Sequence, residues 1–234
     1  GIIKEERIGN QRLILGDCLQ VMGTMGRFDA VVTDPPYGMN YRSIGSVSKQ
    51  GRKVREPLYG RGKAVIGDSE TFDAGPLTRF PGKKIIWGGN HFADQLPPSP
   101  GWLIWDKRGR DFYGKTTQSD CEMAWTSWMG SARLYLQIWN GIVRQGIEAS
   151  APRYHTTQKP IALMEWCLGF LPDAKTILDP YAGSGTVSVA CQRMGRFSTS
   201  IEIDPDYFQI MCKRVDEAAR QPDLLIPETR HAPV

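Results

Sequence analysis

The sequence is poor in the residues that build metal sites and disulfide frameworks. Among 234 residues it has three widely spaced histidines (His91, His155 and His231) and five cysteines, with no Cys-x-x-Cys pair. This pattern disfavours a zinc site and a disulfide framework and fits a reducing cytoplasm. No apolar run approaches the ~18–20 residues that a membrane span requires, and residues 1–7 lack a signal-peptide layout. We therefore expect a cytoplasmic protein that is not transmembrane and needs no metal.

The residues that are present are typical of one globular domain. Hydrophobic residues make up 41% and charged residues 23% of the chain, which argues against disorder. Short apolar runs predict strands near residues 12–15, 28–33, 84–87, 102–105, 121–125, 134–138, 176–178 and 197–203. Helices are predicted near residues 19–25, 160–170, 186–194 and 205–219. The alternation predicts a parallel α/β sheet in one domain, residues 8–220, followed by a loose tail at 221–234.

Three stretches, 38–68, 107–119 and 139–158, are interpreted as insertions in that domain, and the first is strongly basic. Between Tyr41 and Lys63 a single acid, Glu56, accompanies seven basic residues. These are Arg42, Lys49, Arg52, Lys53, Arg55, Arg61 and Lys63. A solvated surface loop explains this charge, and so does a cationic arm on phosphates, with Tyr41 and Tyr59 available to stack. The net charge of +4 permits a polyanionic partner.

A glycine turn follows the strand predicted at 176–178 and opens the next helix. Gly183 and Gly185 would let the backbone approach a ligand closely, and Glu202, at the end of the following strand, is placed to bind a ribose diol. A tight turn with a structural acid is the alternative interpretation. The turn lacks a third glycine and a following lysine, and Asp179 would repel a diphosphate. The pattern therefore favours the cationic S-adenosylmethionine (AdoMet) over NAD or ATP.

The strand predicted at 28–33 ends in Asp34-Pro35-Pro36-Tyr37. Two prolines hold the departing chain rigid and aim the Asp34 carboxylate and the Pro35 carbonyl at one point. Two such acceptors can bind both hydrogens of an exocyclic base amine and free its lone pair for attack on a methyl sulfonium. Tyr37 can stack on the base, which must first leave the duplex. A purely structural proline turn is the competing interpretation.

Together these motifs resemble those of the AdoMet-dependent DNA amino-methyltransferases that modify adenine N6 or cytosine N4. The permuted β group of that family has the Asp-Pro-Pro-Tyr motif first and the glycine motif late, as in this chain. Matching segments are residues 34–37, the His155-Thr156-Thr157-Gln158-Lys159-Pro160 stretch, residues 179–186, and Glu202 with Tyr207. The resemblance implies a doubly wound, mostly parallel, seven-stranded Rossmann-like sheet with its last strand antiparallel.

The resemblance also implies a role for each matching residue. The catalytic residues would be Asp34, Pro35, Pro36 and Tyr37. The cofactor would be held by Asp17, Asp34, His155, Gln158, Lys159, Pro160, Asp179, Tyr181, Ala182, Gly183, Ser184, Gly185, Thr186, Glu202 and Ile203. Asp17 is equally well explained as a helix cap, and His155 as an ordinary loop residue. Tyr181 stands where the family more often has Phe, and the segment expected to recognise the target sequence, residues 129–154, is short.

The function implied is transfer of a methyl group from AdoMet to the N6 amine of a flipped-out adenine in DNA. Cytosine-N4 methylation is the nearest alternative. The resemblance favours adenine over it, because at the position of Asp34 the family more often has Asp for adenine and Ser for cytosine-N4. Methylation of RNA or of protein glutamine is a further alternative, and a catalytically inactive nucleic-acid-binding module is one from another class. The glycine pattern disfavours a nicotinamide oxidoreductase. A restriction partner and a homodimer are both compatible with the sequence.

Overall fold

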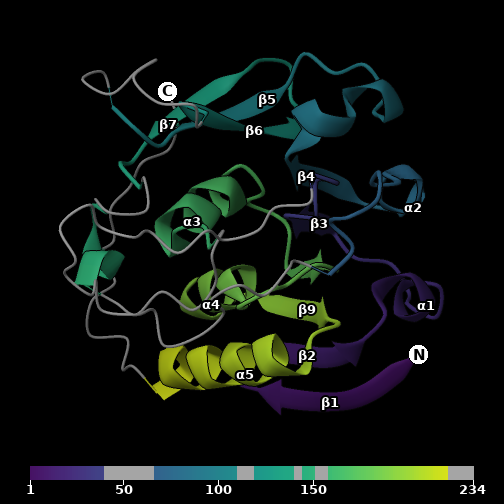
Figure 1. Ribbon diagram of the computed structural model, residues 1–234. Coiled ribbons are helices and arrows are strands. Elements are labelled where there is room, and N and C mark those ends of the chain that lie inside the picture. The colour runs from purple at the N-terminus through teal and green to yellow at the C-terminus, as the bar shows by residue number, and fades with distance from the viewer. Residues whose placement is uncertain (40–65, 110–118, 140–143, 151–157, 221–234) are drawn as a thin grey trace, which may run out of the picture.

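The computed structural model describes residues 1–39, 66–109, 119–139, 144–150 and 158–220 (Figure 1). The predicted DNA-binding residues between Arg42 and Lys63, the predicted cofactor residue His155 and the tail from residue 221 lie outside these ranges. Within them, no helix has the length and apolar character needed to cross a bilayer.

A single sheet of nine strands organises the described residues, in the order β1-β2-β9-β8-β3-β4-β6-β5-β7. Its strands are β1 (Ile2–Ile8), β2 (Gln11–Gly16), β3 (Ala30–Thr33), β4 (Lys83–Trp87), β5 (Trp102–Asp106), β6 (Cys121–Thr126), β7 (Arg133–Leu136), β8 (Thr176–Asp179) and β9 (Phe197–Glu202). Strands β2, β9, β8, β3 and β4 run parallel, whereas β1 and β6 are antiparallel to their neighbours β2 and β4. The predicted mostly parallel α/β class is confirmed.

The strand count differs from the seven that the resemblance implied. Eight of the nine strands fall on predicted segments, and β1 was not predicted because its polar composition, with Lys4, Glu5 and Glu6 in sequence, hides the strand pattern. This strand is exposed at the sheet edge, so only its pairing with β2 identifies it.

Helices cover both faces of the sheet, with α3, α4 and α5 on one face and α1 and α2 on the other (Figure 1). The helices are α1 (Cys18–Met22), α2 (Gly75–Arg79), α3 (Ile161–Gly169), α4 (Thr186–Arg193) and α5 (Pro205–Arg220), with 3-10 turns η1 (Gly89–Gln95) and η3 (Ile147–Ser150). α1, α3, α4 and α5 were predicted. α2 was not predicted, because its short sequence begins with Gly75-Pro76, a pair typical of turns.

Alternation along the strands divides the core between the two faces. In β3, Ala30 and Val32 belong to the cluster beneath α3, α4 and α5, whereas Val31 belongs to the cluster on the α1 and α2 side. This period of two is what buries a strand on both faces and makes it read as a continuous apolar run. The sheet is therefore a rigid support from which loops at the strand ends project.

Candidate active site

The corner after β3 and the glycine turn after β8 leave the same edge of the sheet. β3 and β8 are parallel neighbours, with Ala30 opposite Ile177 and Val31 opposite Leu178. A buried hydrogen bond of 2.7 Å from the Thr33 hydroxyl to the Asp179 carboxylate joins their carboxyl ends. Two segments 146 residues apart in sequence are thereby brought together at the switch-point edge where α/β sheets bind ligands. The predicted convergence of the two motifs is confirmed.

A buried carboxylate that the sequence analysis missed fixes the Asp34 corner. Asp68 accepts hydrogen bonds from the backbone N–H groups of Tyr37 (2.9 Å), Gly38 (2.8 Å) and Met39 (3.2 Å). One oxygen of an acid therefore holds three successive amides just after the two prolines. The chain leaving β3 is fixed by proline rings on one side and by a charged anchor on the other.

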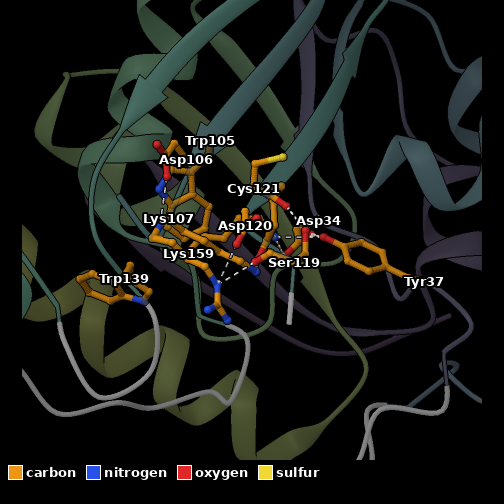
Figure 2. Close-up of polar contacts among 12 residues, drawn as sticks. Asp34, Tyr37, Trp105, Asp106, Lys107, Ser119, Asp120, Cys121, Trp139 and Lys159 are labelled. Atoms are coloured by element: carbon orange, nitrogen blue, oxygen red, sulfur yellow. Dashed lines mark hydrogen bonds and ion pairs between the residues drawn. The ribbon is translucent and has the colours of Figure 1, made fainter. Parts of the chain in front are cut away.

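Both oxygens of Asp34 have partners within the protein (Figure 2). The Tyr37 hydroxyl donates to Asp34 Oδ1 at 2.6 Å, and the Lys159 ammonium contacts Oδ2. Lys159 also donates to the Tyr37 hydroxyl at 3.1 Å. Burial raises the pKa of Asp34 above its ordinary value, although Lys159 acts in the opposite direction. Lys159, expected at the cofactor, thus touches the expected catalytic carboxylate.

The Tyr37 ring is held by packing contacts with two neighbouring residues. It stacks on the imidazole of His91 in η1, with ring centroids 4.8 Å apart and planes 14° apart. Gly88, in a left-handed conformation with φ of +71°, lies directly against the ring, since a Cβ at this position would be 1.9 Å from Tyr37 Cε1. No sequence signal singled out His91 as a neighbour of Tyr37, because η1 joins the corner only through the pairing of β3 with β4.

Two further charged residues extend the cluster around Lys159. Glu122 in β6 accepts from Lys159 at 3.2 Å and, through its other oxygen, from Lys107 at 2.8 Å. Burial raises the pKa of Glu122, but the two lysines outweigh it and lower that pKa to about 2. Burial also lowers the pKa of Lys159, yet Asp34 and Glu122 hold it above its usual value. Neither Glu122 nor Lys107 was predicted to belong to the site.

Both glycines of the turn after β8 have backbone conformations that favour glycine. Gly183 and Gly185 have φ of +53° and +78°, and a Cβ on Gly185 would lie 2.6 Å from Met211 Cγ. Glu202, at the end of β9, accepts from the N–H of Gly183 at 2.7 Å and from the N–H of Asp204 at 2.7 Å. These bonds are the ones expected of a structural acid beside a tight turn, the alternative interpretation, while the contact of Glu202 with a ribose diol stays a prediction.

Two buried acids give this part of the site its charge. Asp179 is 2% exposed and Glu202 is 8% exposed. Burial raises the pKa of each carboxyl to about 7, only partly offset by hydrogen bonds from Thr33 to Asp179 and from backbone amides to Glu202. A bound cation favours the ionised form of both acids, and the turn beside them has two glycines. This combination fits a ligand that carries an ammonium and a ribose diol. The residues present therefore fit AdoMet.

Arg214 of α5 is a buried residue that forms hydrogen bonds with the glycine turn. Its guanidinium donates to the Ser184 carbonyl at 2.6 Å, the Ser184 hydroxyl at 2.8 Å and the Thr186 hydroxyl at 3.2 Å. It also pairs with Glu148 of η3 at 3.9 Å, and Glu148 accepts from the Ile161 N–H at the start of α3 at 2.5 Å. The Arg214–Glu148 ion pair thus contacts both the glycine turn and the start of α3, which follows Lys159 in the sequence.

Replacing Arg214 by methionine should destabilise the fold by about 2–4 kcal/mol, because Glu148 and the Ser184 carbonyl would lose a buried partner. Urea unfolding measures the change. Arg220→Met in the same helix is the matched control, since Arg220 is exposed and pairs with Asp216 four residues earlier. Equal stability of the two variants would contradict this account of Arg214.

The other predicted cofactor residues lie around this edge with more ordinary contacts. Asp17 caps α1, where its carboxylate accepts from the Leu19 N–H at 2.9 Å. The Tyr181 ring meets Phe72 edge-on at 5.6 Å, and Ala182 is buried. The Gln158 carbonyl accepts from the Trp139 indole at 3.0 Å, and Pro160 is the N-cap of α3. Ile203 is 46% exposed just beyond β9.

A cavity of about 490 Å³ opens at the opposite edge of the sheet, beside the amino ends of β3 and β4. Its lining includes Arg27, Asp29, Lys83 and Asp173. Three donors from Lys175 and Thr176 already satisfy the Asp29 carboxylate. The cavity offers neither a glycine turn nor the acid pair, so the carboxyl edge is the better candidate. Within the described residues, no group of three or more His, Cys, Asp or Glu could hold a metal ion.

Comparisons with known proteins agree with this geometry. Residues 104–213 match the family model described as DNA methylase, of the N6 and N4 type. The Type II methyltransferase M2.DpnII of Streptococcus pneumoniae is 30% identical over 119 residues, covering 49% of this chain and 41% of that protein. The Type II methyltransferase M.ScaI of Streptomyces caespitosus is 25% identical over 252 residues, covering 88% of this chain and 81% of that protein.

Solved structures show the same fold at low identity. The PvuII DNA methyltransferase, cytosine-N4-specific, has a TM-score of 0.61 at 13% identity over 92% of this chain and 90% of that one. TTHA0409 of Thermus thermophilus, solved in complex with S-adenosyl-L-methionine, has a TM-score of 0.50 at 18% identity over 88% and 95%. Parallel strands with a glycine turn and an acidic proline corner at one edge define an α/β methyltransferase fold.

Within that class, residues 104–213 are similar to the DNA methylases of the N6 and N4 type. The chain spans less than half the length of M2.DpnII and about four fifths of M.ScaI. The residues matched by the family model include the glycine turn and Lys159 but not the Asp34 corner. The hydrogen bond between Thr33 and Asp179 and the contact of Lys159 with Asp34 connect that corner to the matched part of the chain.

Proposed function

We propose that this protein transfers a methyl group from AdoMet to the exocyclic N6 amine of an adenine that has left the DNA duplex. The observation that carries the proposal is the placement of Asp34, at the end of β3, next to Asp179 and the glycine turn at the end of β8. A proline corner serving only as structure would not require a carboxylate at the same edge of the sheet as the glycine turn.

The cofactor would be held by the acidic and glycine-rich edge described above. Asp179 would face its ammonium, Glu202 its ribose hydroxyls and Gly183 its methionine end, with Asp17 and Ile203 toward its adenine. The cofactor site would be completed by the remaining predicted residues: Tyr181, Ala182, Ser184, Gly185, Thr186, His155, Gln158, Lys159 and Pro160. When bound, AdoMet supplies an electrophilic methyl group on a sulfonium. The protein's own part is to bind this cation beside two acids in a partly water-excluded site.

The residues of the Asp34 corner would prepare the amine for attack. An exocyclic amine is a poor nucleophile, because its lone pair is delocalised into the base. The Asp34 carboxylate and the Pro35 carbonyl would each accept one of its two hydrogens, which draws the nitrogen toward tetrahedral geometry and aims the lone pair. Asp68 keeps the corner rigid through its backbone contacts with residues 37–39, so that little reorganisation is needed.

Cytosine-N4 methylation is the second candidate. It is supported by the similarity in fold to the PvuII DNA methyltransferase, which is cytosine-N4-specific. The aspartate at position 34 favours adenine. The two outcomes are separated by nucleoside mass spectrometry of DNA incubated with the protein and AdoMet. We expect N6-methyladenine; N4-methylcytosine alone would support the second candidate, and neither product would overturn the proposal.

Contacts with DNA are assigned to the basic segment between Arg42 and Lys63, which lies outside the described residues. Its charge would neutralise backbone phosphates while the corner binds the extruded base. Residues 129–154 would contribute to recognition of the target sequence. A homodimer, a partner restriction enzyme and a cytoplasmic location stay predictions from the sequence.

The affinity for AdoMet should rise with pH. Because Asp179 and Glu202 have a pKa of about 7, both are largely neutral near pH 6 and ionised near pH 8. Each acid that must ionise to bind should tighten binding by about tenfold between these pH values. Isothermal titration calorimetry measures the dependence, which Asp179→Asn should make shallower. An affinity independent of pH would contradict the roles given to these acids.

The same shifts have the opposite consequence for the unliganded fold. A carboxyl whose folded pKa is raised contributes stability that is fully present below its unfolded pKa, near about 4, and lost as the pH rises through about 7. The free protein should therefore lose stability over the range in which it gains affinity for the cofactor. Thermal unfolding with and without AdoMet, recorded across this range, would show the two trends separately.

A further inference from the structure

Lys159 contacts two carboxylates that come from different parts of the chain, those of Asp34 and Glu122. Figure 2 shows Lys159 beside Asp34. Its ammonium has three donors, and three acceptors surround it: Asp34, Glu122 and the Tyr37 hydroxyl. The side chain is 5% exposed. It also lies 5.5 Å from the centroid of the Trp87 ring, where a cation is stabilised without a further acceptor.

This arrangement leaves the Asp34 carboxylate occupied. One oxygen accepts from Tyr37 and the other contacts Lys159. A target amine that is to donate a hydrogen to Asp34 must compete with a charged donor, and a neutral amine is the weaker partner. Entry of the base therefore requires an alternative acceptor for the Lys159 ammonium, because an unpaired buried charge is costly.

Glu122 is that acceptor, and it is already in place. It sits within β6, paired with Trp105 of β5, and it receives a second cation, Lys107, at 2.8 Å. The backbone next to Lys159 is fixed by the bond from Trp139 to the Gln158 carbonyl. Only the flexible lysine side chain then needs to move, over the short separation between Asp34 and Glu122.

We propose that Glu122 is a positioning residue that draws the Lys159 ammonium away from Asp34 when the target amine enters, leaving the Asp34 carboxylate free to accept a hydrogen bond from that amine. In the absence of DNA, the Lys159 ammonium is the hydrogen-bond partner of the Asp34 carboxylate. The inference rests on the proposed function, since it assigns Asp34 to the target amine. It gives each residue of the cluster its own role. Asp34 contacts the target amine, Lys159 occupies the Asp34 carboxylate before the amine enters, and Glu122 binds the Lys159 ammonium once the amine has entered.

The charged groups around Asp34 predict how its titration responds to these neighbours. Facing it are Lys159 from the segment before α3, Glu122 from β6 and Asp179 from the end of β8. Behind these lie Lys107 on Glu122, Asp68 on the corner amides, His91 on the Tyr37 ring and Glu202 near Asp179. Glu122 raises the pKa of Asp34 and Lys159 lowers it. Removing the charge of Glu122 should thus lower the pKa of Asp34 for two reasons. A nearby negative charge is lost, and Lys159 no longer divides its hydrogen bonds between Asp34 and Glu122.

The test replaces Glu122 by glutamine in the full chain and uses two readouts. In the first, aspartate labelled with ¹³C at the side-chain carboxyl is titrated by NMR, with the Asp34 signal assigned through Asp34→Asn. The midpoint for Asp34 should move to lower pH in Glu122→Gln. In the second, the single-turnover rate of methyl transfer to DNA should fall by about 10- to 100-fold, with AdoMet affinity unchanged. The acid limb of its pH profile should follow the NMR midpoint downward.

Glu165→Gln is the matched control, because Glu165 lies on α3 and pairs with Arg193 of α4 away from this cluster. It should leave both readouts at the wild-type values. An Asp34 midpoint that stays in place or moves upward in Glu122→Gln overturns the inference, as does an unchanged rate. Absence of transfer by the wild-type chain would overturn the proposed function, while the NMR titration would still decide the role of Glu122.

Lys107→Met provides a second variant with the opposite sign. Without Lys107, both oxygens of Glu122 are available to Lys159, and the negative charge felt by Asp34 increases. The Asp34 midpoint should then move to higher pH. A shift of the Asp34 midpoint to lower pH in Lys107→Met would overturn the inference, and this variant decides the matter even if Glu122→Gln is too unstable to assay.

Discussion

The Asp34→Ala variant is expected to transfer methyl groups to DNA about a thousandfold more slowly than the wild-type chain, because it loses a preorganised acceptor for the target amine. Its affinity for AdoMet should change little, since the glycine turn, Asp179 and Glu202 are held by contacts that do not involve Asp34. Tritium transfer from labelled AdoMet to DNA measures the first quantity, and calorimetry the second.

Asp94→Ala is a suitable control, because Asp94 is an exposed aspartate in η1, the turn that also carries His91. It should match the wild-type chain in both assays. Wild-type transfer by Asp34→Ala would show that the proline corner does not handle the amine. Loss of AdoMet binding in that variant would instead place Asp34 chiefly in the cofactor site, as the family resemblance also allows.

Gly88→Ala should reduce methyl transfer by about a hundredfold through a displacement of the Tyr37 ring. The added Cβ would lie 1.9–2.5 Å from three ring atoms, and the backbone at position 88 has a φ that a side chain strains. The ring cannot move freely, because it stacks on His91 while its hydroxyl holds Asp34. We expect a fall in stability of about 1–3 kcal/mol and a lower rate at saturating DNA.

A double-mutant cycle separates the two effects. If Gly88→Ala acts through the ring, adding it to Tyr37→Ala should cost little further activity, because the clashing atoms are gone. Additive losses of activity would contradict this, and would mean that strain at position 88 disturbs the site by another route. Urea unfolding of the same four proteins gives the strain contribution independently.

Local sequence patterns predicted most of the strands and helices and the two loops of the site. The apolar runs at residues 28–33 and 176–178 predicted two buried strands, and the residues that follow them predicted the two loops of the site. The helix after Gly185 was predicted from its glycine start. β1 escaped because an exposed edge strand has no apolar face, and it is defined only by its partner β2.

The supporting residues of the site could not be predicted, because they are defined by tertiary contacts. Asp68 binds amides about thirty residues earlier, and Arg214 reaches the glycine turn from the last helix. Glu122 left one signal, an acid inside a strand that otherwise pairs with apolar neighbours, which implies a buried cationic partner. The identity of that partner, Lys159, follows only from the packing of the segment before α3 against β6.

The central claim is that one site spans the carboxyl ends of β3 and β8. A crystal structure of the protein with S-adenosylhomocysteine, the demethylated product, tests it most directly. We predict that the ligand contacts Gly183 and Glu202 and turns its sulfur toward Asp34. A ligand bound instead in the cavity beside Arg27 and Lys83, at the other edge of the sheet, would contradict it.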